Sequence, residues 1–102
     1  MTAWTFAAKA EGVLEGTANM VTADGRLIAL YRIGADIFAS DGFCPHEGQC
    51  LDSGFVENGT VECSLHYAVF EITTGAMISG PETRPLPVYP VKVEGGEVFV
   101  GL

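Results

Sequence analysis

Turn-forming residue pairs divide much of this chain into short segments, and this limits the folds that it can adopt. The pairs are Asp24-Gly25, Gly34-Ala35, Asn58-Gly59, Thr74-Gly75 and Gly95-Gly96. Asn-Gly, Asp-Gly and Gly-Gly tolerate the positive φ of tight hairpin turns, so they mark points where one strand folds back on the next. Residues 88–94 show the period-two alternation of a strand, and the neighbouring segments are rich in β-branched residues.

The pattern predicts an all-β fold with roughly seven to ten short strands. The expected strands cover residues 17–23, 26–33, 36–40, 55–56, 60–63, 69–73, 88–94 and 97–100. A helical turn is expected only near residues 9–14. Trp4 and Phe6 are expected in the core, because large aromatic side chains are usually well buried.

Length and charge restrict the domain organisation and the partners. The 102 residues suffice for one small domain, so residues 1–102 are predicted to form a single domain. Thirteen acidic residues against five basic ones give a net charge of -8. Such a surface disfavours nucleic acid and anionic membranes as partners and favours a protein with a basic patch. No signal-peptide pattern and no apolar run of about 18 residues is evident, so we expect a cytoplasmic protein.

Two stretches do not fit the strand pattern. Residues 42–54 combine Cys, Pro, His and Gly, and residues 80–87 contain three prolines, which a central strand does not accept. Loops of this length in a small domain are usually functional. The chemistry is therefore expected in these loops and in the segment 63–68.

The residues suited to bind metal form a two-part motif. Cys44 and His46 are separated by one residue, and Cys63 and His66 follow 16 residues later, with two residues between them. Each half offers one thiolate and one imidazole. Because the chain has only two histidines, their position beside two of the three cysteines argues against chance.

Three interpretations of this motif are open. A 2Fe–2S cluster can take two cysteines on one iron and two histidines on the other, so that each loop supplies one ligand to each metal. A structural zinc also accepts two cysteines and two histidines, although zinc motifs usually pair like with like. In the third interpretation the cysteines are small buried hydrophobes and the histidines lie at the surface.

Beyond this motif, the chain resembles the small Rieske ferredoxins of bacterial aromatic-ring-hydroxylating dioxygenase systems of the biphenyl and naphthalene type. The resemblance rests on Cys44-Pro45-His46, Cys63-Ser64-Leu65-His66, Gly48, Gly54, Phe70, Thr74-Gly75 and the run from Gly80-Pro81 through Arg84-Pro85-Leu86-Pro87-Val88-Tyr89. It implies stacked antiparallel β-sheets with a small cluster-binding subdomain formed by the loops at about 42–54 and 63–68. The proline-rich loop 80–87 would then lie against the cluster.

The resemblance also implies a function. One Rieske-type 2Fe–2S cluster would be held by Cys44, His46, Cys63 and His66, with no catalytic residues. The chain would be a monomeric one-electron carrier between an NAD(P)H-dependent flavoprotein reductase and a terminal Rieske non-haem iron oxygenase in aromatic-compound degradation. The alternatives are a small Rieske subunit of a nitrite-reductase-type complex and a zinc-stabilised interaction module. The sequence does not identify the aromatic substrate.

Two departures from the high-potential Rieske branch are informative. That branch has a second cysteine in each loop, whereas this chain has Leu65 at one of the two positions, so Cys50 is expected to be a packed loop thiol. It also has a Ser and a Tyr that donate hydrogen bonds to the cluster, where this chain has Ala68 and Phe70. The losses predict a low reduction potential.

Five carboxylates also flank the two ligand loops in the sequence. They are Asp41, Glu47, Asp52, Glu57 and Glu62. Two interpretations remain open for them: a docking rim for a basic partner, or an ordinary solvated face.

Overall fold

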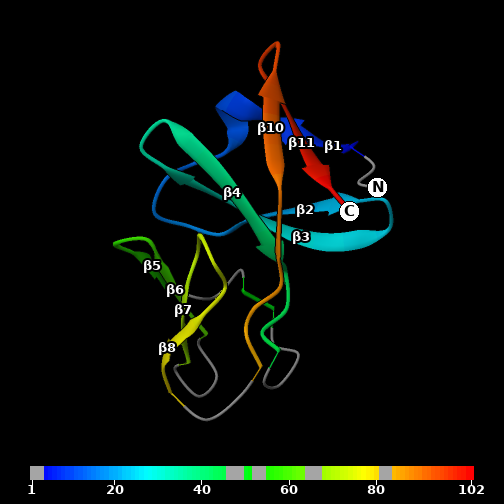
Figure 1. The fold of residues 1–102 in the computed structure, drawn as a ribbon. Coiled ribbons are helices and arrows are strands. Elements are labelled where there is room, and N and C mark those ends of the chain that lie inside the picture. The colour runs from blue at the N-terminus through cyan, green and yellow to red at the C-terminus, as the bar shows by residue number, and fades with distance from the viewer. Residues whose placement is uncertain (1–3, 46–49, 52–54, 64–67, 81–83) are drawn as a thin grey trace.

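The structure is a computed structural model that describes residues 4–45, 50–51, 55–63, 68–80 and 84–102. These residues form eleven short strands and one 3-10 turn, η1 (Ala10–Gly12). The strands make three antiparallel sheets (Figure 1). The predicted all-β class is confirmed, and the strand number slightly exceeds the expected one. Within the described residues, no helix has the length and apolarity needed to cross a membrane.

The three sheets are built mainly from hairpins. The first has the order β1 (Trp4–Lys9), β11 (Glu97–Gly101), β10 (Val91–Glu94). The second has the order β2 (Asn19–Ala23), β3 (Arg26–Ile33), β4 (Asp36–Asp41), β9 (Val88–Tyr89). The third has the order β5 (Phe55–Glu57), β6 (Thr60–Glu62), β7 (Val69–Glu71), β8 (Met77–Ser79). In Figure 1 the first and third sheets lie at opposite ends of the molecule.

The second sheet is the middle layer, because β3 is buried on both faces. Ile28 and Leu30 belong to a core with Val98 and Val100 of the first sheet. Ala29 and Tyr31, which alternate with them, belong to a second core with residues of the third sheet. A strand covered on both faces carries a continuous apolar run, which explains the sequence of β3.

The predicted strand 88–94 is divided in two by Pro90. Residue 88 pairs with Ser40 of β4, whereas Val91 pairs with Val100 of β11. Proline has no N–H to donate to a sheet, so the chain leaves the middle sheet at Pro90 and joins the first one. The strands β1 and β8 were not expected, and the helical turn expected near residues 9–14 is reduced to η1.

The expectation that Trp4 and Phe6 lie in the core is wrong. Their exposed fractions are 43% and 47%, because both side chains lie on the outer face of the first sheet. The Phe6 ring meets Phe99 edge-on at 6.0 Å, and the Lys92 ammonium lies 5.0 Å from the centroid of the Trp4 ring. Phe6 and Phe99 thus pack edge-on, and the Lys92 ammonium over the Trp4 ring is a cation–π arrangement.

One polar pair lies inside the second core. The Tyr31 hydroxyl is 2.8 Å from the Ser40 hydroxyl, and Ser40 in turn donates a hydrogen bond to the Asp41 carbonyl at 2.9 Å. Burial raises the pKa of Tyr31 to about 12, an effect that the hydrogen bond between Tyr31 and Ser40 partly offsets. Tyr31 therefore stays neutral in the folded protein at a pH where a tyrosine in the unfolded chain would be ionised.

This pKa predicts a loss of stability at alkaline pH. An unfolded tyrosine ionises near pH 10, so the contribution of Tyr31 is fully present below pH 10 and is lost as the pH rises through about 12. Two pKa units correspond to about 2.7 kcal/mol at most. Urea unfolding of the native chain and Tyr31→Phe should show that the stability difference between them changes by up to that amount above pH 10, in favour of the variant. A difference that stays constant up to pH 12 would contradict a buried Tyr31 hydroxyl.

Candidate metal centre

Cys44 lies in a loop that starts at the end of β4 and is closed by backbone hydrogen bonds. The Gly42 N–H donates to the Leu27 carbonyl at 3.0 Å, and the Leu51 N–H donates to the Gly42 carbonyl at 2.8 Å. Phe43 and Cys50 form an isolated antiparallel bridge between these two points. The base of the first predicted loop is therefore fixed to the middle sheet.

Cys63 begins a shorter loop that connects β6 and β7. Its N–H donates to the Ala68 carbonyl at 2.8 Å, which closes the loop over residues 63–68. The flanking pairs Glu62–Val69 and Val61–Phe70 continue the ladder of the third sheet. Cys63 is thus placed at the point where a hairpin opens into a loop, as expected from the sequence.

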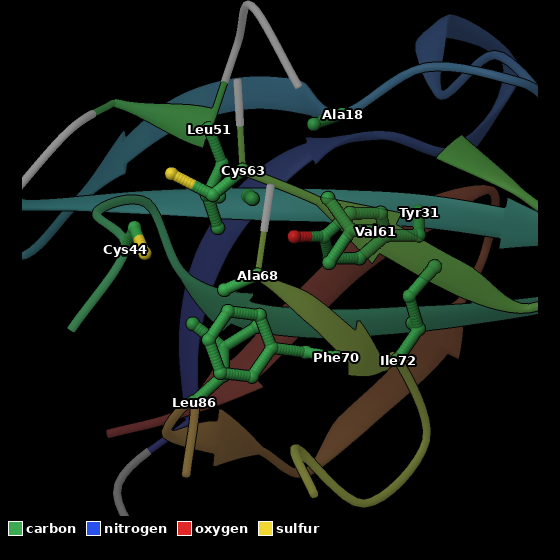
Figure 2. Close-up of a cluster of buried hydrophobic side chains, with 11 residues drawn as sticks. Ala18, Tyr31, Cys44, Leu51, Val61, Cys63, Ala68, Phe70, Ile72 and Leu86 are labelled. Carbon is green, nitrogen blue, oxygen red and sulfur yellow. The ribbon is translucent and has the colours of Figure 1, made fainter. Parts of the chain in front are cut away.

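The two cysteines are brought together in the same buried core. Cys44 is 0% exposed and Cys63 is 2% exposed, and both belong to the cluster that includes Leu51, Ala68 and Phe70. In Figure 2 both thiols lie toward the same edge of this cluster. Two residues that are 19 positions apart in the sequence therefore meet at one site, as a shared centre requires.

The other two predicted ligands, His46 and His66, lie outside the described residues. The donors that are described fit the predicted group. Two thiolates in an apolar core need a compensating positive charge, since burying uncompensated charge is costly. The oxidised 2Fe–2S core carries about two positive charges, which would balance them.

Cys50 differs from the other two cysteines. It is half-buried at the end of the first loop, where its backbone bridges Phe43. Its position outside the two-part motif agrees with the expectation of a packed loop thiol. No ligand role is predicted for Cys50 from the sequence, and nothing in its position changes that prediction.

The described parts of the proline-rich segment 80–87 connect to the same region. Leu86 is 1% exposed and belongs to the core that contains Cys44 and Cys63. The Asp41 N–H donates to the Pro87 carbonyl at 2.9 Å, just before the first loop. Leu51 and Leu86 were not predicted as walls of the site, although the position of Leu86 between two prolines was a signal for it.

The positions without a hydroxyl are also part of this core. Ala68 and Phe70 are both 0% exposed. Because neither side chain contains an N–H or O–H group, neither brings a hydrogen-bond donor to the site. Tyr31 brings a hydroxyl into the same core from β3, but it lies at hydrogen-bonding distance from Ser40. The side chains described around the two cysteines are therefore mainly apolar.

Comparison with known proteins identifies this arrangement. Residues 3–90 match the model of the Rieske 2Fe–2S domain. The ferredoxin component of the naphthalene 1,2-dioxygenase system of Pseudomonas aeruginosa is 35% identical over 99 residues, which cover 97% of this chain and 95% of that protein. The chain belongs to the Rieske 2Fe–2S domain family.

Solved structures show the same relationship. The ferredoxin of carbazole 1,9a-dioxygenase from Nocardioides aromaticivorans IC177 superposes with a TM-score of 0.89 at 28% identity, covering 96% of each chain. A ferredoxin in complex with its oxygenase, from a carbazole 1,9a-dioxygenase, superposes with a TM-score of 0.87 at 33% identity, covering 96% of this chain and 92% of that one. A nitrite reductase small subunit from Mycobacterium tuberculosis shares the fold, with a TM-score of 0.86 at 24% identity over 100% of this chain and 96% of that one.

These findings confirm the resemblance, the Rieske fold and one Rieske-type cluster as cofactor. They also confirm that the chain is an electron carrier of the ferredoxin type and not itself a catalytic enzyme, because its relatives are ferredoxin components. The zinc interpretation is thereby set aside.

The ligand set remains a prediction that substitution can test. His46→Ala and His66→Ala should each abolish the EPR signal of the reduced Rieske centre, because each removes one of two imidazoles on one iron. Cys50→Ser, which lies outside the motif, is the control and should retain two irons and two sulfides per chain. Iron and sulfide analysis with EPR measures both. Loss of the cluster in Cys50→Ser but not in His46→Ala would reverse the assignment.

Proposed function

We propose that this chain is a mobile one-electron carrier that holds its cluster through Cys44, His46, Cys63 and His66. It takes an electron from an NAD(P)H-oxidising flavoprotein reductase and delivers it to a terminal Rieske oxygenase. The observation that carries the proposal is the burial of Cys44 and Cys63 in one core at the ends of two loops. It also rests on the ferredoxin components among the relatives of this chain.

The chain's own residues would hold the centre and limit its contact with water. Cys44 and Cys63 would bind one iron from the protein interior, and His46 and His66 would bind the other. The cluster, when bound, supplies a reversible one-electron couple. Leu51, Phe70 and Leu86 form apolar walls that keep water from the thiolate side. Because no reacting substrate needs a pocket, such a site requires only a nearby docking surface.

The described surface near the ligand loops suits a docking partner of opposite charge. Asp41 precedes Cys44 by three residues and Glu62 directly precedes Cys63, and both are half-buried at the ends of their strands. Phe55, which is 61% exposed, pairs with Glu62 between β5 and β6, and Phe43, which is 43% exposed, follows Asp41 by two residues. Apolar contacts with a charged rim are typical of protein interfaces. A carbazole dioxygenase ferredoxin is known in complex with its oxygenase.

We also propose that the carrier is a monomer in the cytoplasm. The second candidate, a fixed subunit of a nitrite-reductase-type complex, is favoured by one observation, the exposed aromatic side chains on the outer face of the first sheet. Size-exclusion chromatography with light scattering separates the two, because a shuttle should elute as a monomer.

The docking proposal predicts a change in association rate. Asp41→Asn combined with Glu62→Gln should slow electron transfer to the oxygenase by roughly two- to threefold at low salt, since rim charges act mainly on encounter rates. The difference should vanish at high salt. Glu11→Gln in η1, at the other end of the molecule in Figure 1, removes one exposed charge and is the control. Stopped-flow kinetics measures both, and an equal effect of the control would contradict a local docking rim.

The apolar surroundings of the centre predict its potential. With Ala68 and Phe70 in place of hydroxyl donors and a net charge of -8, the midpoint should lie at the low end of the Rieske range, about -150 to -50 mV. Phe70→Tyr and Ala68→Ser should raise it where the new hydroxyl reaches a sulfur. Phe99→Tyr, on the first sheet, is the matched control and should leave it unchanged. Protein-film voltammetry measures the midpoint, and a native value above about +100 mV would be incompatible with the proposal.

A further inference from the structure

Two glycines fasten the proline-rich segment to the third sheet. Gly75 is buried in the turn between β7 and β8, with φ of +81°. A Cβ atom at this position would overlap the carbonyl oxygen of Leu86. The Leu86 N–H donates to the Gly75 carbonyl at 2.8 Å, and the Gly75 N–H donates to the Glu71 carbonyl at 2.7 Å. The backbones are thus in a contact that any side chain at position 75 would break.

The second contact lies at the other end of the segment. Gly80 has φ of +116°, and a Cβ atom there would lie 2.6 Å from the Cα atom of Ala68. This distance is shorter than two carbon atoms that are not bonded can approach. A side chain at position 80 would therefore force Gly80 and Ala68 apart. Ala68 is the residue whose carbonyl accepts the Cys63 N–H and closes the second ligand loop. Gly80 therefore touches the base of the loop that carries Cys63.

Both contacts lead directly to the buried cysteines. The Leu86 side chain, which Gly75 fixes through the backbone, lies in the same core as Cys44 and Cys63 (Figure 2). Ala68, on which Gly80 rests, belongs to this core as well. A displacement of either contact would therefore open the wall beside the thiols, and it would leave the distant core of the first sheet intact.

We propose that Gly75 and Gly80 are positioning residues that hold Leu86 and Ala68 in place beside Cys44 and Cys63 and thereby set the water exposure of the cluster. The proposal rests on the ligand set proposed above. Exposure acts on the reduction potential because the reduced centre is more negative than the oxidised one. Water stabilises the more charged form, so a loosened segment raises the midpoint and lets the cluster be lost faster.

The chain offers a matched control for the conformational cost of the substitution. Gly16 has φ of +82°, nearly the same as Gly75, but a Cβ atom there would meet nothing within 4 Å. Gly75→Ala and Gly16→Ala therefore introduce the same left-handed alanine, and only the first breaks a contact with the proline-rich segment. Gly80→Ala is a second, independent variant in case Gly75→Ala does not fold.

The experiment compares the three holoproteins with the native chain. The readouts are the midpoint potential from voltammetry, the rate of iron release to a ferrous chelator and the thermal unfolding midpoint. We expect Gly75→Ala and Gly80→Ala to raise the potential and to release iron roughly tenfold faster, which corresponds to about 1.4 kcal/mol of weakened docking. Gly16→Ala should lower only the unfolding midpoint.

Two results would overturn the proposal. If both variants lose thermal stability while potential and iron release stay at the native values, the glycines serve stability alone. If the potential falls, exposure is not what the contacts control. Failure of this proposal can be distinguished from failure of the proposed ligand set. A wrong ligand set would show as a missing Rieske EPR signal in the native chain and in Gly16→Ala.

Discussion

The double burial of β3 is the constraint on which the rest of the structure depends. Ile28 and Leu30 face the first sheet, and Ala29 and Tyr31 face the third. One strand thus supplies two cores, which is how a chain of 102 residues supports a metal-binding subdomain beside a stable sandwich. The first ligand loop depends on this strand directly, because Gly42 is hydrogen-bonded to the Leu27 carbonyl.

This arrangement separates stability from redox chemistry. The core between the first and second sheets contains neither Cys44 nor Cys63. The core beside the third sheet contains both, and its hairpins have strands of only three residues. Short strands leave little to fix the loops, so backbone contacts at Gly42, Gly75 and Gly80 take over that task. Close backbone contacts thus add to the side-chain packing around Cys44 and Cys63.

Much of the fold could be predicted because turn residues and alternation are local signals. The strand 26–33 was predicted with the bounds that β3 has, since a turn precedes and follows it. The placement of Cys44 and Cys63 in two loops was predicted from their motif and from the resemblance, whereas their complete burial was not. By contrast, Trp4 and Phe6 were predicted to lie in the core from their residue type, and that prediction is wrong. Residue type alone does not tell which face of an outer sheet is covered. The contact of Leu86 with Gly75 could not be predicted from the sequence either, because only the tertiary fold brings these two residues together.

The charge of the chain and the apolar surroundings of the centre act together. An electron added to a domain with net charge -8 meets repulsion that the apolar walls do little to screen. The same charge attracts a basic partner, and this attraction weakens as the salt concentration rises. It therefore supports fast encounters better than tight complexes. A carrier must leave each partner after every electron. In the proposed docking surface, a small apolar contact at Phe43 and Phe55 would meet that requirement better than an extensive hydrophobic interface.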